Sequence, residues 1–137
     1  DSKNRINIPA PLRKQFSSKD KKTFVVTRGI DNCAWIYPIT EWKKIQNELQ
    51  QLSSLSKTNR IFLRNHLRHA NILKFDSQGR FVLPQSLIDY ASIKKDVTII
   101  GVLNKIEIWN SKLLNEIDKS EKIDDQSYDQ LSERVNI

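Results

Sequence analysis

Two arginines, Arg5 and Arg80, occupy matching places in a phrase that the sequence contains twice. The phrase reads DSKNRINIP at residues 1–9 and DSQGRFVLP at residues 76–84. An arginine guanidinium can bind O6 and N7 of a guanine through two parallel hydrogen bonds, and a lysine at the tip of a turn can bind a phosphate. The pattern therefore favours Arg5, Arg80 and the neighbouring Lys3 as DNA contacts.

The same arginines have a structural alternative. Asp1 precedes Arg5 by four residues, and Asp76 precedes Arg80 by four, so each arginine could brace its own turn through an ion pair. Both roles can coexist.

The charges around the two copies of the phrase differ. Gln78 stands in the second copy where Lys3 stands in the first. Arg13 and Lys14, which follow the first copy, could contact phosphates or could be ordinary solvated charges, and Ile-Asp at 88–89 replaces them in the second half. We therefore expect the first half to face DNA more closely. The candidate DNA-binding residues are Lys3, Arg5, Arg80, Arg13 and Lys14.

Other residues with chemical potential show weaker patterns. Arg60, Arg64 and Arg68 recur every four residues and share one face of an expected helix. They could bind DNA, pair with a neighbouring subunit or pair with the acidic end of the chain. His66 and His69 could share a metal ion, but no third ligand has suitable spacing, so we expect no metal site.

The sequence offers no convincing catalytic centre. Gly29, Gly79 and Gly101 are too scattered for a phosphate loop or a dinucleotide fingerprint. Asp1 and Asp76 could meet as a carboxylate pair, but the arginine after each would hold it ionised and oppose a shared proton. We therefore expect a protein that is not an enzyme and that needs no cofactor.

The aromatic residues and the single cysteine favour structural roles. Trp35, Trp42, Tyr37 and Trp109 are expected in the core or in subunit contacts. Cys33 lies among apolar residues and is expected to be buried filler, not a redox sensor. One cysteine cannot form an internal disulfide, which favours the reducing cytosol.

The repeated phrase has the composition of a tight turn. Asp76 suits its first position and Gly79 its fourth, and Asn4, the replacement for that glycine in the first copy, tolerates positive φ. A short strand is expected after each turn, and then a helical turn opened by Pro9 or Pro84.

A hairpin and a helix should follow in each half. We expect the hairpin turns at Asn32 and Asn104, with asparagine in the left-handed conformation. Apolar spacing then predicts the helices. The further expected elements are a helix after Pro38 reaching about Leu52, a helix at about 57–70, a strand ILKF before Asp76, and a helix SKLLNEI after Trp109.

This order of landmarks indicates an internal duplication. Gly29 corresponds to Gly101 and Ile36 to Ile108. One repeat is too small for a core of its own, so two repeats should cover each other. The expected fold is therefore α+β and β-rich, with approximate two-fold symmetry. The expected organisation is a single double-repeat domain over 1–115, with repeat 1 at about 1–52, the inter-repeat helix at about 57–70, repeat 2 at about 71–115, and an acidic helix or tail at 116–137.

Charge is divided unevenly along the 137 residues. Residues 1–75 hold 15 Lys and Arg against 5 Asp and Glu, a net charge of +10, whereas residues 76–137 hold 8 against 11, a net charge of −3. A basic body suggests a polyanionic partner such as nucleic acid, and the acidic end suggests a solvated tail. No apolar run approaches the ~18–20 residues of a membrane span. The sequence lacks methionine, so we expect a leading segment before Asp1.

The chain resembles the MraZ family, within the SpoVT-AbrB group of swapped-hairpin DNA-binding domains. The resemblance covers roughly residues 1–115 and is carried by the doubled D-x-x-x-R followed by I-P or L-P, by GIDNCAWIYPITEW and GVLNKIEIWN, and by the helical insert RIFLRNHL. Departures are the absent first strand, Asn4 where glycine is usual, and an acidic end that does not align.

The resemblance implies a fold and a function. Two interleaved repeats would close one small β-barrel, and about eight or twelve subunits would form a ring. Such proteins are transcriptional regulators, typically repressors. They bind repeated boxes in double-stranded DNA upstream of the division and cell-wall operon, usually at their own promoter. They act in the cytoplasm at the nucleoid, and some are linked to the neighbouring ribosomal RNA methyltransferase.

The alternative function is a protein-interaction module, either antitoxin-like or a ring scaffold whose basic face binds an acidic protein. Salt dependence combined with a preference among DNA sequences separates the two hypotheses.

Overall fold

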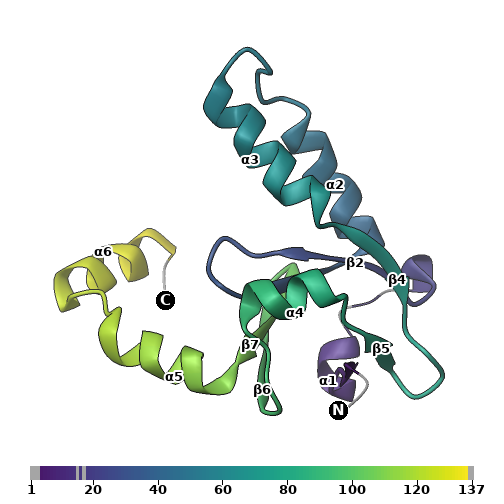
Figure 1. Cartoon of the computed structure of the whole chain (residues 1–137). Helices are drawn as coiled ribbons and strands as arrows, with labels where there is room; N and C mark the ends of the chain where they lie inside the picture. The colour runs from purple at the N-terminus through teal and green to yellow at the C-terminus, as the bar shows by residue number, and fades with distance from the viewer. Residues whose placement is uncertain (1–3, 15, 17, 136–137) are drawn as a thin grey trace.

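The computed structural model describes residues 4–14, 16 and 18–135 of the chain. Its strands form two sheets, one of two strands and one of five (Figure 1). The small sheet pairs β1 (Arg5–Asn7) with β5 (Arg80–Val82). The large sheet has the order β4-β2-β3-β7-β6 and consists of β2 (Thr23–Arg28), β3 (Ala34–Pro38), β4 (Asn71–Lys74), β6 (Val97–Val102) and β7 (Lys105–Asn110).

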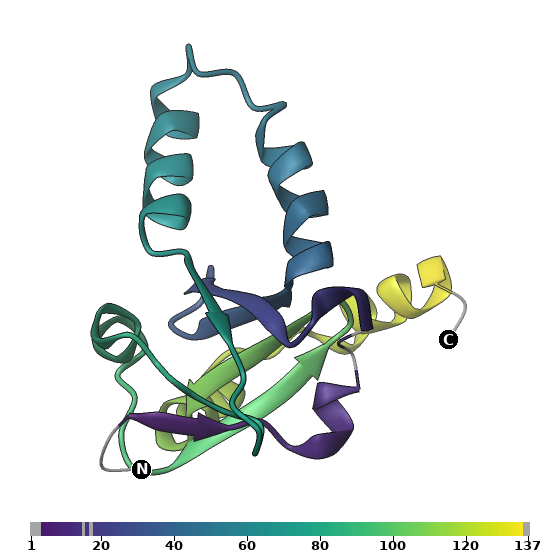
Figure 2. The same ribbon diagram turned by 90° about the vertical axis from the view of Figure 1, so that its right-hand side faces the viewer.

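Helices surround the sheets and extend from them. They are α1 (Ala10–Arg13), the 3-10 turn η1 (Ser18–Asp20), α2 (Ile39–Leu49), α3 (Lys57–Arg68), α4 (Gln85–Ala91), α5 (Ser111–Ser120) and α6 (Asp125–Val135). Figures 1 and 2 show α2 and α3 projecting from the sheet as a helical hairpin, while α5 and α6 lead away in another direction. Within the described residues, no helix is long and apolar enough to cross a membrane.

The α+β class is confirmed, but the expected closure into one barrel is wrong for the described residues. β1 and β5 pair with each other and not with the large sheet. Pro9 and Pro84 follow these strands closely, and proline has no N–H with which to extend a ladder. The swapped hairpins and the approximate two-fold symmetry stay predictions.

The β1–β5 pair brings the two copies of the phrase side by side. Ile6 lies opposite Phe81, and both are buried. The two turns are joined by reciprocal backbone bonds: Leu83 N–H donates to the Asn4 carbonyl at 2.9 Å, and Ile8 N–H donates to the Gly79 carbonyl at 3.2 Å. The predicted short strand and proline-led helix are confirmed in both copies, and the predicted turn is confirmed in the second copy; residues 1–3 of the first turn lie outside the described residues.

The central strands of the large sheet are buried on both faces. One face joins β1 and β5 in a core that includes Ile8, Phe24, Ile36, Leu83 and Ile106. The other face carries the second core cluster, which includes Val25, Cys33, Trp35, Tyr37, Trp42 and Trp109. The expected core role of the tryptophans is therefore confirmed, and the sheet is a rigid base for the turns.

Backbone conformation supports one turn prediction and contradicts another. Asn4 and Gly79 have φ values of 61° and 78°, as expected for equivalent turn positions. The expected left-handed conformation of Asn32 and Asn104 is wrong, because neither residue has a positive φ. In the second hairpin the positive φ, 58°, belongs to Leu103. The strands end at Val102 and Lys105, so Leu103 is the first loop residue and takes the strained position; its side chain is 93% exposed.

Candidate nucleic-acid interface

Arg5 and Arg80 lie on the same face of the β1–β5 pair. Arg5 is opposite Val82, and Arg80 is opposite Asn7. The central pair, Ile6 and Phe81, points into the core, so the four flanking residues point outward. Diagonal neighbours in an antiparallel pair are about 7–8 Å apart, so the two arginines project side by side from this face.

The Asp76 carboxylate holds Arg80 and its turn. Asp76 Oδ1 accepts the backbone N–H groups of Gln78 and Arg80 at 2.8 and 2.9 Å, and Oδ2 accepts Arg80 Nε–H at 3.0 Å. The backbone N–H of Arg80 is the largest cause that lowers the pKa of Asp76, so the carboxylate is ionised at neutral pH. The brace expected from D-x-x-x-R is therefore present in the second copy.

This brace leaves the outer end of Arg80 available. In the described part of the chain, Nε is the only Arg80 side-chain atom that forms a hydrogen bond, and the side chain is 33% exposed. Its two terminal nitrogens form no hydrogen bond with the described residues. The structure thus permits the bracing role and the DNA-contact role on one side chain.

Arg13 lies against the turn of the other repeat. A Cβ placed on Gly79 would overlap Nη1, Cζ and Nε of Arg13, so the guanidinium packs directly on the glycine backbone. Arg13 Nε is buried and has no hydrogen-bond partner among the described residues. The structure therefore joins Arg13 to the Asp76–Arg80 turn, whereas Lys14, the C-cap of α1, is exposed.

Lysine pairs flank both turns. One pocket beside the second turn is lined by Arg13, Lys21, Lys22 and Asp76, among others. A second pocket is lined by Asn4, Arg5 and Asn7 together with the pair at 94–95, Lys94 and Lys95. We call the surface formed by Arg5, Arg13, Arg80 and these two lysine pairs the turn surface.

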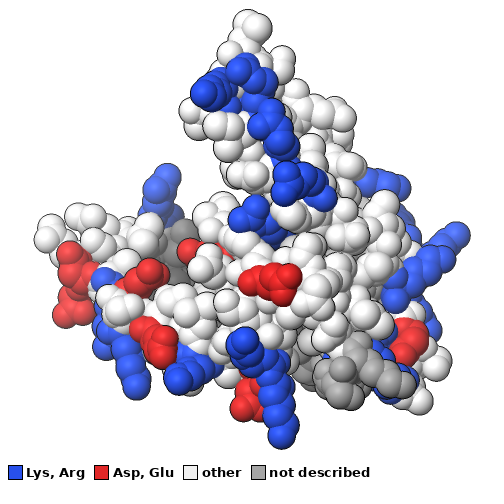
Figure 3. All heavy atoms as spheres, in the orientation of Figure 1, with Lys and Arg blue, Asp and Glu red and all other residues white. Residues whose placement is uncertain are grey.

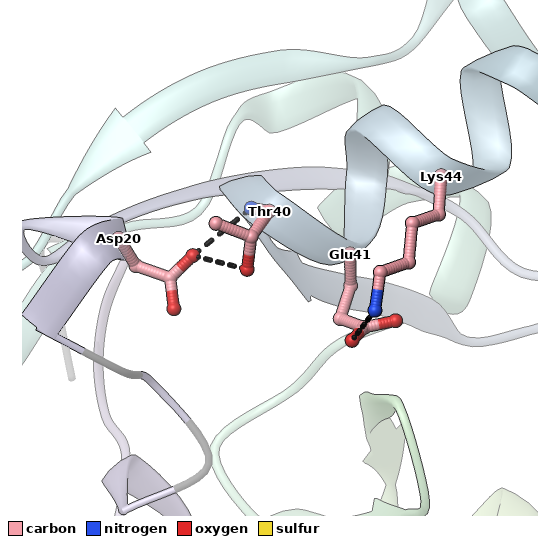
Figure 4. Close-up of polar contacts among 4 residues, drawn as sticks. All are labelled: Asp20, Thr40, Glu41 and Lys44. Atoms are coloured by element: carbon pink, nitrogen blue, oxygen red, sulfur yellow. Dashed lines mark hydrogen bonds and ion pairs between the residues drawn. The ribbon is translucent and has the colours of Figure 1, made fainter.

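The first lysine pair is held in a fixed conformation. Lys21 and Lys22 have φ values of 49° and 62°, which is unusual for residues with a side chain. The preceding Asp20 is buried and accepts both the backbone N–H and the hydroxyl of Thr40, at 2.9 and 2.8 Å (Figure 4). Pro38 cannot cap α2 with its side chain, so Asp20 caps this helix and fixes the lysine turn to it.

The remaining candidates from the sequence, His66 and Cys33, are both buried. His66 is buried and stacks on Phe62 with ring centroids 5.7 Å apart, and burial lowers its pKa. In the described residues, no group of three or more possible ligands is arranged for a metal. Cys33 is fully buried, and burial raises its pKa to about 12, so its thiol is unreactive at neutral pH.

The two hairpins are joined by one carboxylate on the sheet face that carries the second core cluster. Glu107 on β7 accepts the indole N–H of Trp35 at 2.9 Å and that of Trp109 at 3.0 Å. Trp35 lies opposite Glu107 in the β3–β7 pair. The side chains thus reinforce the contact between the repeats.

Comparison with known proteins identifies the duplication. The family described as "MraZ protein, putative antitoxin-like" matches residues 1–65 and again residues 66–135. The chain belongs to the MraZ family. Each match contains one copy of the D-x-x-x-R phrase, so the inferred duplication and the resemblance are confirmed.

Similar MraZ proteins match along most of their length. A protein from Clostridium tetani is 39% identical over 99% of this chain and 90% of its own length. A protein from Halothermothrix orenii is 45% identical over 82% of this chain and 76% of its own, and one from Natranaerobius thermophilus is 38% identical over 98% and 90%. Each is named "Transcriptional regulator MraZ", so the expectation of a non-enzymatic family is confirmed.

The MraZ repeats contain functional candidates that sequence reasoning missed. Lysine pairs precede the hairpins of both repeats, as KKTFVV from residue 21 and KKDVTII from residue 94. The similar position of a lysine pair before each hairpin was a signal that the sequence contained. Of the candidates that were named, Lys3 lies outside the described residues, as does Asp1, the possible partner of Arg5.

Proposed function

We propose that this MraZ-family chain is a sequence-specific DNA-binding transcriptional regulator that reads DNA with the turn surface. The carrying observation is that Arg5 and Arg80 share the outer face of a two-stranded ribbon, with Arg80 oriented by Asp76. The names of the relatives support a regulator. The basic excess of residues 1–75 supports a polyanionic partner.

The geometry suits the major groove. That groove is about 12 Å wide and admits a two-stranded β-ribbon. With β1 and β5 in the groove, Arg5 and Arg80 would each bind a guanine edge, which supplies the preference among sequences. Arg13, Lys14 and the two lysine pairs would meet phosphates on the flanking strands, which supplies affinity for any duplex.

The proposal includes a ring of about eight or twelve copies that binds repeated boxes, because several weak turn surfaces gain affinity when their spacing matches the spacing of the boxes. The target is the chain's own promoter upstream of the division and cell-wall operon, the effect is repression, and the place of action is the nucleoid in the cytoplasm. These expectations rest on the family resemblance.

The test is fluorescence anisotropy with a labelled duplex from the chain's own promoter and a scrambled duplex, over a series of salt concentrations. The wild type should prefer the promoter, and Arg5→Ala/Arg80→Ala should lose that preference, at about 1–3 kcal/mol for each guanine contact, or about 5- to 150-fold. Lys44→Ala, which removes an exposed side chain of α2, is the control. If the folded double variant keeps the full preference, the arginines are turn braces only.

The alternative is a protein-interaction module. The α2–α3 hairpin supports it, because Leu55, Ile61 and Phe62 are 90%, 43% and 41% exposed. The family description also contains the term antitoxin-like. Such a module would bind DNA without preferring the promoter duplex, so the same anisotropy series separates the two functions.

A further inference from the structure

The C-terminal helix α6 has an apolar stripe that the rest of the described chain leaves exposed. Tyr128, Leu131 and Val135 recur at helical spacing and are 60%, 52% and 62% exposed. Figures 1 and 2 show α6 beyond α5, away from the α2–α3 hairpin in both views. An amphipathic helix ordinarily buries such a stripe, so α6 has the form of a docking element.

An acidic edge runs beside this stripe. Asp125, Asp129 and Glu133 recur every four residues on α6, and at about 100° per residue they fall to one side of the apolar positions. Residues 121–135 contain five acidic side chains and two basic ones, a net charge of −3. A surface that binds α6 should therefore combine an apolar groove with a row of cations.

The α2–α3 hairpin has that combination. Leu49, Leu63 and Leu67 line a groove between the helices, together with Gln46 and Gln50. Arg60, Arg64 and Arg68 run along α3 directly beside Leu63 and Leu67, with the same spacing of four as the acids of α6. Residues 39–70 contain six basic and two acidic side chains, a net charge of +4. Figure 3 shows the basic side chains along the front of the hairpin.

The two helices match when they run antiparallel. When each helix is viewed from its N-terminus, the charged row lies on the same side of the apolar row in both helices. Two helices packed face to face in opposite directions therefore bring apolar row onto apolar row and charged row onto charged row. With Arg64 opposite Asp129, the register also places Arg60 by Glu133 and Arg68 by Asp125. It brings Leu67 to Tyr128 and Leu63 to Leu131.

We propose that α6 of one copy docks on the α2–α3 hairpin of a second copy, antiparallel to α3. Within the chain, α6 and the hairpin lie apart (Figures 1 and 2), and the hairpin groove is open. Because each copy donates one helix and accepts another through different surfaces, the contact is head-to-tail, which is the interface type that closes rings. The inference deepens the ring assembly of the proposed function by naming its contact.

The test measures the mass of the protein alone by sedimentation, without DNA. Arg64→Glu places an acid opposite Asp129, and Asp129→Arg places a cation opposite Arg64. Each variant alone should fall toward the 16.0 kDa of one chain. The charge changes are on exposed residues, so circular dichroism should show an intact fold. Combining both changes in one chain should restore the wild-type mass.

Mixing the two single variants decides between docking on another copy and docking within one chain. In an alternating assembly, the acid introduced at position 64 of one variant meets the cation introduced at position 129 of the other. The unchanged Arg64 likewise meets the unchanged Asp129, so the mixture should regain the mass that each variant lost. Docking within one chain would give no such recovery. Recovery in the mixture supports the proposal, and its absence overturns it.

Matched controls repeat the charge changes elsewhere. Lys44→Glu lies on α2 with its side chain 72% exposed, and Asp118→Arg lies on exposed α5. Both should keep the wild-type mass. A wild type that sediments as one chain, or single variants that keep its mass, would also overturn the proposal. Neither result would contradict the proposed promoter preference of the turn surface. That preference depends on Arg5 and Arg80 and is measured separately by anisotropy.

Discussion

Asp76 and Arg80 are joined twice, because the carboxylate accepts both the backbone N–H and the side-chain Nε–H of the arginine, at 2.9 and 3.0 Å. The first bond closes the turn, and the second aims the guanidinium. A single aspartate thus couples the shape of the turn to the direction of the side chain proposed to read DNA. A separation of four residues in the sequence allows Asp76 to make both contacts with Arg80.

This coupling predicts the behaviour of Asp76→Asn. The amide can still accept the backbone bonds, but it loses the charge that holds Arg80, so promoter preference should fall by less than in Arg80→Ala while binding to scrambled DNA stays equal or rises slightly. Anisotropy with both duplexes measures this. Equal preference in Asp76→Asn and wild type would show that the turn alone aims the arginine.

Gly79 should resist replacement for two separable reasons. Gly79→Ala puts a side chain at φ 78° and against the Arg13 guanidinium, so the free energy of unfolding should fall by about 1–3 kcal/mol. In an Arg13→Ala background the overlap is gone, and the cost of Gly79→Ala should shrink to the backbone part. Urea unfolding of the four proteins measures the difference. An equal cost in both backgrounds would mean that Arg13 moves aside freely.

Asp20→Ala should destabilise the hairpin base. Asp20 is buried, and its carboxylate accepts hydrogen bonds from the backbone N–H and the hydroxyl of Thr40 in the first turn of α2. Loss of this cap should lower the free energy of unfolding by about 1–2 kcal/mol. Glu41→Ala removes the exposed 3.2 Å pair with Lys44 on the same helix turn and should cost about 0–1 kcal/mol (Figure 4). Urea unfolding compares the two variants. A cost for Glu41→Ala equal to that for Asp20→Ala would contradict the capping role.

Local signals in the sequence were sufficient for the elements that carry the site. Turn residues with positive φ, alternating apolar residues and helix-opening prolines each act over a few residues. This is why the strand and helix of both copies could be predicted, together with the turn at Gly79 and the positive φ of Asn4. The α3 helix was predictable for the same reason. Ser56, its N-cap, accepts the backbone N–H of Asn59 at 3.2 Å.

What could not be predicted depends on contacts between distant segments. Arg13 of the first repeat packs on Gly79 of the second, and nothing near either residue in the sequence indicates it. The division into sheets of two and five strands is likewise a choice among strand partners, which the pattern of single strands leaves open. Leu103 shows the same limit on a small scale, because the strand ends, and not its own preference, impose its conformation.

His66 should make stability depend on mildly acidic pH. Burial lowers the pKa of its imidazole below the ordinary 6.5, so the folded protein keeps the ring neutral while the unfolded chain takes up a proton. The free energy of unfolding should therefore fall as the pH drops below about 6.5, and it should level off below the folded pKa. Urea unfolding at intervals from pH 7.5 to pH 5 measures the slope.

The matched variants separate this histidine from its neighbour. His66→Phe keeps a ring between Phe62 and Trp42 and removes the proton site, so most of the pH slope should disappear. His69 also has a lowered pKa, from burial and from the nearby Arg28 and Arg68, but it is less buried, so His69→Gln should remove a smaller part. If His66→Phe keeps the full slope, protonation of the unfolded chain at His66 does not govern the acid response, and the burial argument for this residue is wrong.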